Sequence, residues 1–310
     1  MLIKDPPVAI LPHLVMLGTN EYPLFLFKGD REGAIFEGGV GAMGPLILEQ
    51  LQGLGIGRDF VRQVVVTHAH PDHVMAVPLL REAFPGVRVL ASDAAARTLA
   101  AAKAVAFFRQ IDAGLTASLM NLGRIRPQHC PPPLAEDRIA VDRIIKEGDT
   151  IAVDASASLR VLETPGHSEC SLSFHEPSQG ALVISDATGY YMTDPEDWWP
   201  NYFGGYEAYL ASMRRLADLG AEVLCLSHNG AIRGAEAVRA YFAGAIAATE
   251  RYHERIVNEV RAGRPPREIA GQLGAEIHAR MQLLPLDFFQ KNCWLLVKHS
   301  LKSAGLAADK

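Results

Sequence analysis

Four apolar, strand-like runs in this 310-residue chain are each followed directly by histidine or aspartate side chains. Metal-binding side chains at the ends of such runs are His68, His70, Asp72, His73, His167, Asp186 and His228. In layered α/β proteins, loops at one end of the strands bring residues that are distant in sequence into one cleft. The pattern therefore predicts an α/β fold with nitrogen and oxygen ligands for two metal ions.

The densest part of this pattern, THAHPDH at residues 67–73, has a spacing that suits two ions. In an extended segment His68, His70 and Asp72 project to one side, because side chains alternate with a period of two. His73 falls at the start of a predicted helix and points elsewhere. A polar loop without metal is the alternative, and the density of ligands in this segment argues against it.

The other histidines in the chain stand alone, without neighbouring ligand types. Isolated histidines are more often surface or packed side chains than ligands. We expect this of His13, His129, His175, His253, His278 and His299.

Strand-like and helix-like patterns alternate over the first 234 residues, which predicts layers of sheet and helix. Strands are expected at 11–18, 22–29, 33–39, 63–67, 87–91, 139–145, 150–153 and 159–164. Helices are expected at 45–56, 73–84 and 94–122, the last an alanine-rich insert with Ser92 or Asp93 as its N-cap.

The alternation of strand-like and helix-like runs ends near Gly234. Apolar residues from Val238 to Val260 recur at steps of three and four, which predicts one long amphipathic helix. The segment 262–266 (AGRPP) ends it, and further helices are expected at 266–281 and 288–303, the second capped by Asp287. We therefore predict a domain at 1–234 and a C-terminal helical cap at 235–310.

Composition and charge bear on the partner, the cysteines and the location of the protein. The chain is 49% hydrophobic and 21% charged with a net charge of −5, which argues against a nucleic-acid partner. Its four cysteines lie far apart and predict reduced, mostly buried thiols. The first residues lack a long apolar core and no stretch approaches membrane-spanning length, so we expect a cytoplasmic protein that does not enter the membrane.

The ligand segments together identify a family resemblance. THAHPDH, TPGH ending at His167, ISDA with Asp186 and SHNG with His228 resemble the metallo-β-lactamase-fold hydrolases over about residues 8–234. The resemblance implies a four-layer αβ/βα sandwich with a dinuclear metal site at one edge of two facing sheets. It also implies one ion on His68, His70 and His167, a second on Asp72, His73 and His228, and Asp186 as a bridge.

Departures from the family pattern narrow the resemblance. Class B β-lactamases commonly have a cysteine where this chain has Asp186, so antibiotic hydrolysis is not expected. Flavodiiron proteins have a glutamate where this chain has His70, and their flavodoxin domain is missing here. These two differences favour hydrolysis over oxygen reduction. The insert, the EGG segment at 37–39 and the C-terminal helices are most similar to the quorum-sensing 2-aminobenzoylacetyl-CoA thioesterase and to glyoxalase II.

This metal site predicts a hydrolase of a carboxylic thioester or ester. Two ions that share a bridging water leave hydroxide at neutral pH, and one ion polarises the carbonyl oxygen under attack. Asp72 is suited to orient the hydroxide. Imidazole and carboxylate ligands fit zinc first, and also iron or manganese. A lactonase or phosphodiesterase would use the same chemistry, and a regulatory protein that acts through partner binding is a different-class alternative.

Substrate identity is expected to reside outside the ligand segments. The aromatic segment 189–206 is predicted either to line the pocket, with Tyr190 or Tyr191 as an oxyanion donor, or to pack on its own domain or at a dimer contact. The insert and the C-terminal cap either roof the cleft or form a packing extension. They could equally supply a homodimer surface.

Overall fold

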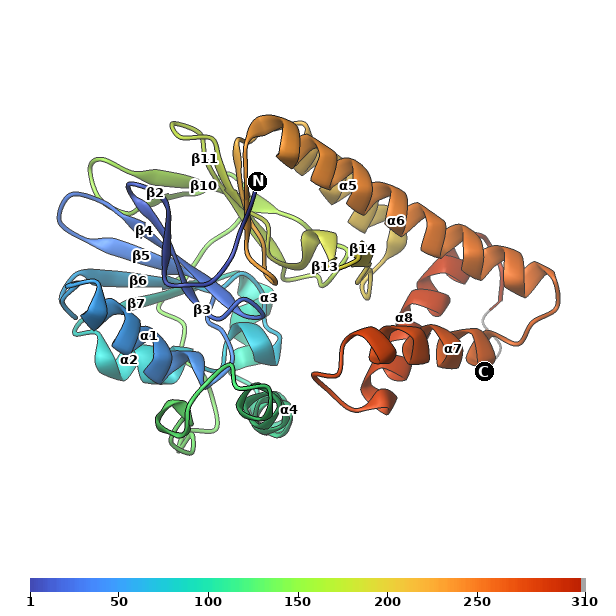
Figure 1. Ribbon diagram of the computed structural model, residues 1–310, viewed down its shortest axis with the longest axis horizontal. Coiled ribbons are helices and arrows are strands. Elements are labelled where there is room, and N and C mark those ends of the chain that lie inside the picture. The colour runs from blue at the N-terminus through green and yellow to red at the C-terminus, as the bar shows by residue number, and fades with distance from the viewer. Residues whose placement is uncertain (308–310) are drawn as a thin grey trace. The chain divides into compact units, whose positions relative to one another are not determined.

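The computed structural model describes residues 1–307, and within them most strands belong to two seven-stranded sheets (Figure 1). One sheet is formed from the first part of the chain. In spatial order its strands are β2 (Val8–Leu11), β3 (Leu14–Gly18), β4 (Pro23–Lys28), β5 (Gly33–Phe36), β6 (Val61–Val65), β7 (Arg88–Ala91) and β8 (Arg143–Ile144). Strands β2 to β5 are antiparallel neighbours, and β5 to β8 are parallel.

The second sheet joins the start of the chain to its middle. In spatial order its strands are β1 (Leu2–Ile3), β16 (Ala231–Arg233), β15 (Val223–Cys225), β12 (Ala181–Val183), β11 (Leu172–Glu176), β10 (Ser158–Glu163) and β9 (Thr150–Ala152). Only β12 and β15 pair in parallel among these described strands. A separate hairpin is formed by β13 (Tyr190–Thr193) and β14 (Glu196–Trp199).

The core lies between the two sheets. Phe36 of one sheet and Phe174 of the other meet edge to face with ring centroids 5.0 Å apart, and both are fully buried. Exposed and buried side chains alternate over most of β10, whereas β3 is buried along its whole length. Strands buried on both faces need cover on their outer side, and α1 packs against β3. The predicted α/β sandwich with C-terminal helices is confirmed.

Helices connect and follow the strands. They are α1 (Met43–Gly53), α2 (Val77–Ala83), α3 (Asp93–Leu99), α4 (Ala102–Asn121), α5 (Tyr206–Ala217), α6 (Ala235–Arg261), α7 (Pro266–Arg280) and α8 (Leu286–Ser303). Short 3₁₀ turns are η1 (Pro71–His73), η2 (Pro127–His129) and η3 (Ser185–Thr188). None of these helices within residues 1–307 is long and apolar enough to cross a membrane.

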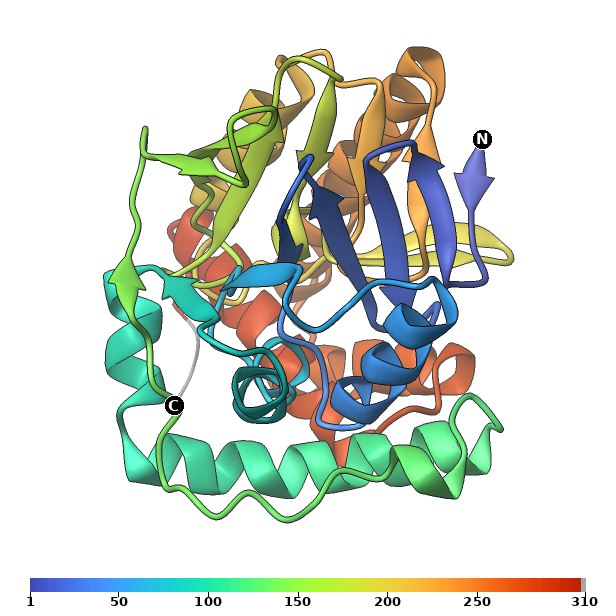
Figure 2. The same ribbon diagram turned by 90° about the vertical axis from the view of Figure 1, so that its left-hand side faces the viewer.

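Contacts divide the chain into two compact units. The first comprises 1–163, 170–185 and 221–237 and contains both large sheets with α1 to α4 (Figure 2). The second comprises 164–169, 186–220 and 238–310. The sequence boundary at 234 coincides with the start of α6, while contacts also assign two internal segments to the second unit.

The expected helix over 94–122 is wrong in one respect, because the structure breaks it into α3 and α4. Ala101 has an extended conformation (φ −89°, ψ 110°), and the carbonyl of Leu99 accepts a hydrogen bond from Ile139 N at 2.9 Å. The Leu99 carbonyl thus bonds to a distant segment instead of to an amide of the following helical turn. The predicted N-cap is confirmed, since the Ser92 side chain accepts from Ala95 N.

Other boundaries also differ from the sequence expectation. The helix expected at 73–84 is the turn η1 followed by α2, because the amides of Met75 and Ala76 bond to the carbonyls of Gly39 and Gly38. The strand expected at 139–145 contains only β8. Asp287 lies inside the first turn of α8, where it pairs with Lys291 at 2.7 Å, and Pro285 occupies the cap position.

Candidate metal centre

The turn after β6 carries four of the predicted ligands. His70 has an extended backbone (φ −109°, ψ 156°), and Pro71 begins the 3₁₀ turn that ends with His73. His73 N donates to the His70 carbonyl at 3.0 Å, which closes this turn. The change from extended chain to 3₁₀ turn directs His68 and His73 differently, and both side chains are buried.

The remaining predicted ligands follow three strands of the second sheet. His167 follows β10, Asp186 follows β12, and His228 follows β15. Gly166, directly before His167, has φ +125°, and a Cβ there would lie 2.3 Å from the backbone of Tyr209. Only glycine fits this conformation and this close approach.

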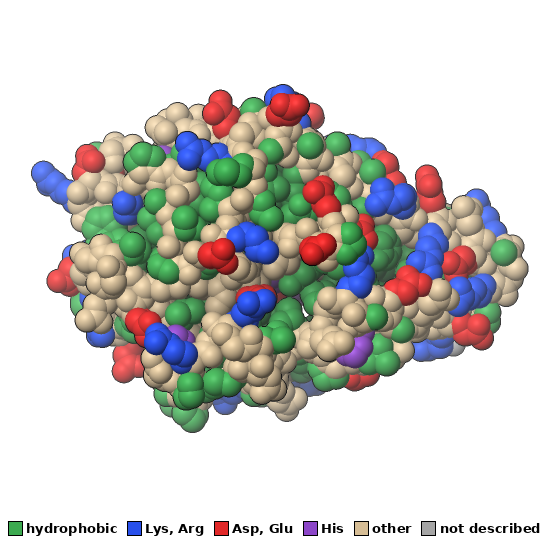
Figure 3. Space-filling model, in the orientation of Figure 1, with side chains coloured by type: hydrophobic (Ala, Val, Ile, Leu, Met, Phe, Trp, Pro, Cys, Tyr) green, Lys and Arg blue, Asp and Glu red, His purple; other side chains and the backbone are tan. Residues whose placement is uncertain are grey.

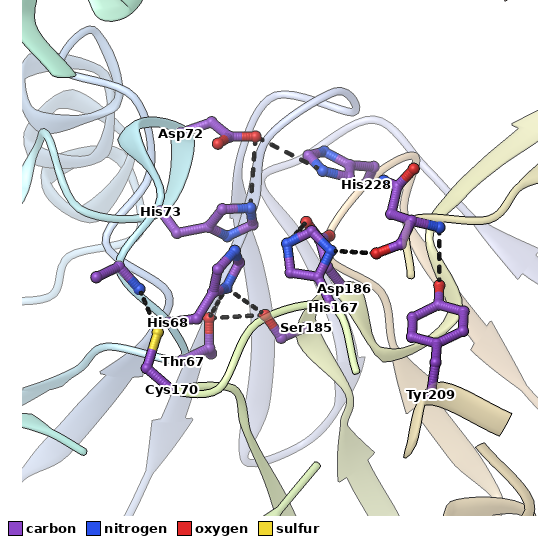
Figure 4. A network of polar contacts seen from close by, with 12 residues as sticks. Thr67, His68, Asp72, His73, His167, Cys170, Ser185, Asp186, Tyr209 and His228 are labelled. Carbon is purple, nitrogen blue, oxygen red and sulfur yellow. Dashed lines mark hydrogen bonds and ion pairs between the residues drawn. The ribbon is translucent and has the colours of Figure 1, made fainter. Parts of the chain in front are cut away.

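The structure brings all seven predicted ligands into two groups. Figure 4 shows these ligands without His70. In each group the candidate ligand atoms lie within 4.8 Å of one another. The first group contains His68, His70, His167 and Asp186, and the second contains Asp72, His73 and His228. These are the two ligand sets that the resemblance implies, with Asp186 in the first. Its bridging role stays a prediction.

Carboxylates approach the Nε2 atoms of three histidines in these groups. Asp72 Oδ2 lies 3.4 Å from Nε2 of His73 and 3.8 Å from Nε2 of His228. Asp186 Oδ2 lies 3.2 Å from Nε2 of His167. In each of these three histidines the other ring nitrogen, Nδ1, makes a buried hydrogen bond.

Hydrogen bonds at Nδ1 determine the tautomer of three of these imidazoles. His73 Nδ1 lies 2.7 Å from Glu37 Oε2, His167 Nδ1 lies 2.9 Å from the Asn201 carbonyl, and His228 Nδ1 lies 2.8 Å from the Glu21 carbonyl. A carboxylate or carbonyl oxygen only accepts, so each Nδ1 carries the proton. The lone pair of the neutral ring is then on Nε2, as a metal ligand requires.

His68 is held by a relay of hydroxyl groups that ends at the same glutamate. Thr67 Oγ1 donates to Glu37 Oε2 at 2.9 Å, and Ser185 Oγ donates to Thr67 Oγ1 at 2.8 Å. With both hydroxyl protons used, His68 Nδ1 donates to Ser185 Oγ across 3.0 Å. Glu37 therefore directs the lone pairs of one histidine in each group.

These residues fit a pair of divalent cations. Buried imidazoles with Nδ1 bonded to the protein, together with carboxylates, form the usual environment of zinc and of other first-row divalent metals. Two carboxylates and five neutral imidazoles would also compensate part of the charge of two ions. The His/Asp cluster thus suits divalent metal binding, and the identity of the metal stays a prediction.

Glu37, Thr67 and Ser185 were not predicted as site residues. Glu37 lies at the end of β5 with φ +80°, a conformation that is uncommon outside glycine. Its side chain is 2% exposed. A carboxylate directly after a buried strand and before two glycines was the available sequence signal.

Tyr190 begins β13 and is half-buried, outside both ligand groups. Its neighbour Tyr191 is buried, with ring centroids 5.1 Å from both Trp198 and Tyr241. Burial raises the pKa of Tyr191 to about 12. Tyr191 therefore packs within its own unit, and the oxyanion role of Tyr190 stays a prediction.

The six histidines expected to be ordinary side chains lie outside both groups, all within the described residues. His129 Nε2 lies 3.2 Å from Glu49, and His253 stacks on Tyr206 with centroids 3.9 Å apart. No disulfide joins the four cysteines, and only Cys130 is exposed. These features agree with the sequence expectation.

Two curated proteins are similar in sequence to part of this chain. A probable metallo-hydrolase of Burkholderia pseudomallei is 30% identical over 134 residues, 41% of this chain and 37% of that protein. The hydroxyacylglutathione hydrolase of Fuscovulum blasticum is 26% identical over 173 residues, 54% of this chain and 48% of that protein. The chain thus spans less than half the length of these two curated relatives.

Solved structures resemble the fold over three quarters of the chain or more. A metallo-beta-lactamase family protein of Thermus thermophilus has a TM-score of 0.60 at 23% identity and covers 96% of this chain and 95% of its own. A Sulfolobus tokodaii superfamily protein has a TM-score of 0.55 at 17% identity over 75% of this chain and 86% of its own. A family model described as the metallo-beta-lactamase superfamily matches residues 23–228. The chain therefore belongs to the metallo-beta-lactamase superfamily.

Proposed function

We propose that this protein is a dinuclear metal-dependent hydrolase of a small-molecule carboxylic thioester or ester. The observation that carries the proposal is the Nδ1 hydrogen bonding of four histidines, which turns the Nε2 lone pairs toward two groups of ligand atoms. A purely structural cluster would not need the same tautomer at each ring. The name of the Fuscovulum blasticum relative, hydroxyacylglutathione hydrolase, supports a thioester.

Two bound divalent ions would supply Lewis acidity at the substrate carbonyl and an activated water as nucleophile. Asp72 is the side chain of the second group with the most access to solvent, at 23% exposed. We assign to it the orientation of the attacking water, by a hydrogen bond to one carboxylate oxygen. The buried histidines hold their positions through the Glu37 relay and through backbone carbonyls.

The proposed substrate is a small molecule rather than a nucleic acid. Acidic and basic side chains are interspersed over the face seen in Figure 3, and the net charge is −5. A phosphate backbone would be attracted by a continuous basic surface. A cytoplasmic location and a homodimer stay proposals, made from sequence features only.

Metal analysis and a substrate panel test this proposal. Purified protein should hold about two ions per chain and should hydrolyse acyl-CoA or glutathione thioesters faster than lactones or bis-p-nitrophenyl phosphate. Asp186→Asn should abolish turnover, whereas His299→Gln, a histidine outside both groups, should not. Faster turnover of the lactone or the phosphodiester would replace the thioester assignment.

Less than one tightly bound ion in folded protein would contradict the dinuclear site itself. A cellular phenotype that survives in the Asp186→Asn variant would favour the regulatory alternative.

A further inference from the structure

Tyr209 lies in the first turn of α5, and its side chain is fully buried. Its hydroxyl accepts a hydrogen bond from Asn201 N at 3.3 Å. The carbonyl of the same residue, Asn201, accepts from His167 Nδ1 at 2.9 Å. Figure 4 shows both hydrogen bonds. A single buried residue therefore connects the Tyr209 hydroxyl to a predicted metal ligand.

Backbone contacts hold this arrangement together. Gly204 N and Gly205 N donate to the Gly166 carbonyl at 2.8 and 3.1 Å. Gly166 directly precedes His167, and its missing side chain leaves room for the backbone of Tyr209. The start of α5 and the turn that carries His167 therefore pack backbone against backbone. In a close-packed interior, a shift of one of them is transmitted to the other.

The Tyr209 hydroxyl also lies beside the chain that follows Asp186. A Cβ at Gly189, three residues after Asp186, would lie 3.0 Å from the hydroxyl oxygen of Tyr209. Burial raises the pKa of Tyr209 well above 10, against the opposing hydrogen bond from Asn201. The hydroxyl therefore stays protonated and acts here as a hydrogen-bond acceptor. His167 and Asp186 are the two ligands that the second unit supplies to the first group.

Loss of the hydroxyl would remove the acceptor of Asn201 N, which belongs to a residue that is 5% exposed. A buried N–H without an acceptor is unfavourable, because it has given up its hydrogen bond to water. The chain is then expected to shift toward another acceptor. Because the carbonyl that holds His167 is part of Asn201, such a shift weakens the hydrogen bond at His167 Nδ1.

We infer that Tyr209 is a positioning residue of the metal centre, which acts through Asn201 to hold the Nε2 lone pair of His167 toward the first ligand group. The inference rests on the dinuclear site of the proposed function and not on the identity of the substrate. Tyr209 would support His167 as Glu37 supports His73. An ion on the first group should therefore depend on Tyr209, whereas an ion on the second group should not.

Cadmium NMR tests this dependence without a substrate. Wild-type protein saturated with cadmium should give a separate resonance for each ligand group. His167→Gln identifies the resonance of the first group, because it removes one nitrogen ligand of that group. In Tyr209→Phe, which keeps the ring, the first group should bind cadmium about 5-fold more weakly in competition with a chelator. The affinity of the second group should not change.

Tyr202→Phe is the matched control. The Tyr202 hydroxyl is also fully buried and lies 2.9 Å from Ser300 Oγ of α8, with no bond toward His167 printed by the same geometry. Both cadmium affinities should therefore stay at their wild-type values in this variant. In thioester hydrolysis, Tyr209→Phe should need about 5-fold more free zinc for half of the maximal rate and should reach the wild-type plateau. A lower plateau at saturating zinc would contradict a positioning role.

The metal-free protein offers a readout that does not depend on the proposed function. The ring proton on His167 Nδ1 should exchange slowly with water, because it lies in a buried hydrogen bond to the Asn201 carbonyl. Its NMR signal should show exchange about 5-fold faster in Tyr209→Phe and unchanged in Tyr202→Phe. Equal exchange in Tyr209→Phe and the wild type would overturn the inference.

These outcomes separate the inference from the proposed function. Faster exchange in Tyr209→Phe, with less than one bound ion in the wild type, would contradict the proposed function and support the positioning of His167. Thioester hydrolysis by a filled dinuclear site, with equal cadmium affinities in the wild type and Tyr209→Phe, would support the function and contradict the inference.

Discussion

Glu37 Oε2 lies 2.7 Å from Nδ1 of His73 and also accepts the hydroxyl of Thr67 at 2.9 Å. One carboxylate oxygen therefore holds a ligand of the second group directly and, through two hydroxyls, a ligand of the first. The other oxygen, Oε1, is buried without a hydrogen-bond partner among the described residues. Glu37 is the common anchor of both groups.

Glu37→Gln should weaken metal binding about 10- to 100-fold. The amide oxygen can accept both hydrogen bonds in the place of Oε2, but the side chain is then neutral, so His73 loses its charged partner. The amide NH2 group takes the buried position of Oε1, which has no hydrogen-bond partner among the described residues. Competition titration with a chelator gives the affinity. Glu82→Gln, at an exposed position of α2, is the control, and equal affinities of the two variants would refute the anchoring role of Glu37.

Gly166→Ala should destabilise the protein by about 2–4 kcal/mol, because φ +125° is strained for alanine and the Cβ would meet the backbone of Tyr209. Gly53→Ala, at the end of α1 with open space around it, should be neutral or slightly stabilising. Urea unfolding measures both. A Gly166 variant as stable as the wild type would mean that this loop adapts at little cost.

The stability of the protein should depend on the ionisation of Asp112. Burial, and secondarily the charge of Asp72, raise the pKa of Asp112 to about 6 from 3.8, against the opposing hydrogen bond from Gly41. Between these two values the folded state binds more protons than the unfolded state, so this contribution is present at low pH and is lost as pH rises through 6.

Asp112→Asn removes that loss. Relative to wild type, its free energy of unfolding should therefore increase by about 2–3 kcal/mol between pH 4 and pH 7. Both proteins are unfolded with urea in a chelator, so that metal release does not contribute. A constant difference across this pH range would contradict the raised pKa.

Tyr190→Phe tests the oxyanion role predicted from the sequence. If Tyr190 donates to the transition state, the variant should lose about 100-fold in kcat with little change in KM. Tyr191→Phe is the matched control, because Tyr191 is buried against Trp198 and Tyr241. Comparable kcat values in the two variants would remove Tyr190 from the reaction.

The ligand residues could be predicted from the sequence alone because each directly follows an apolar strand. His68, His167 and His228 are placed by local chain direction and by the meeting of strand ends at one edge of the sheets. Hydrophobic periodicity likewise predicted α6, whose apolar side chains recur at helical spacing.

Tertiary structure alone decided what supports those ligands. The relay from Glu37 through Thr67 to Ser185 includes a hydrogen bond between residues 118 positions apart, and hydroxyl groups carry no periodic signal in a sequence. The break between α3 and α4 depends on the hydrogen bond from Ile139 to Leu99, against the helical propensity of an alanine-rich segment. Local patterns determine which side chains a strand end presents, whereas partners and cavities depend on which distant segments pack together.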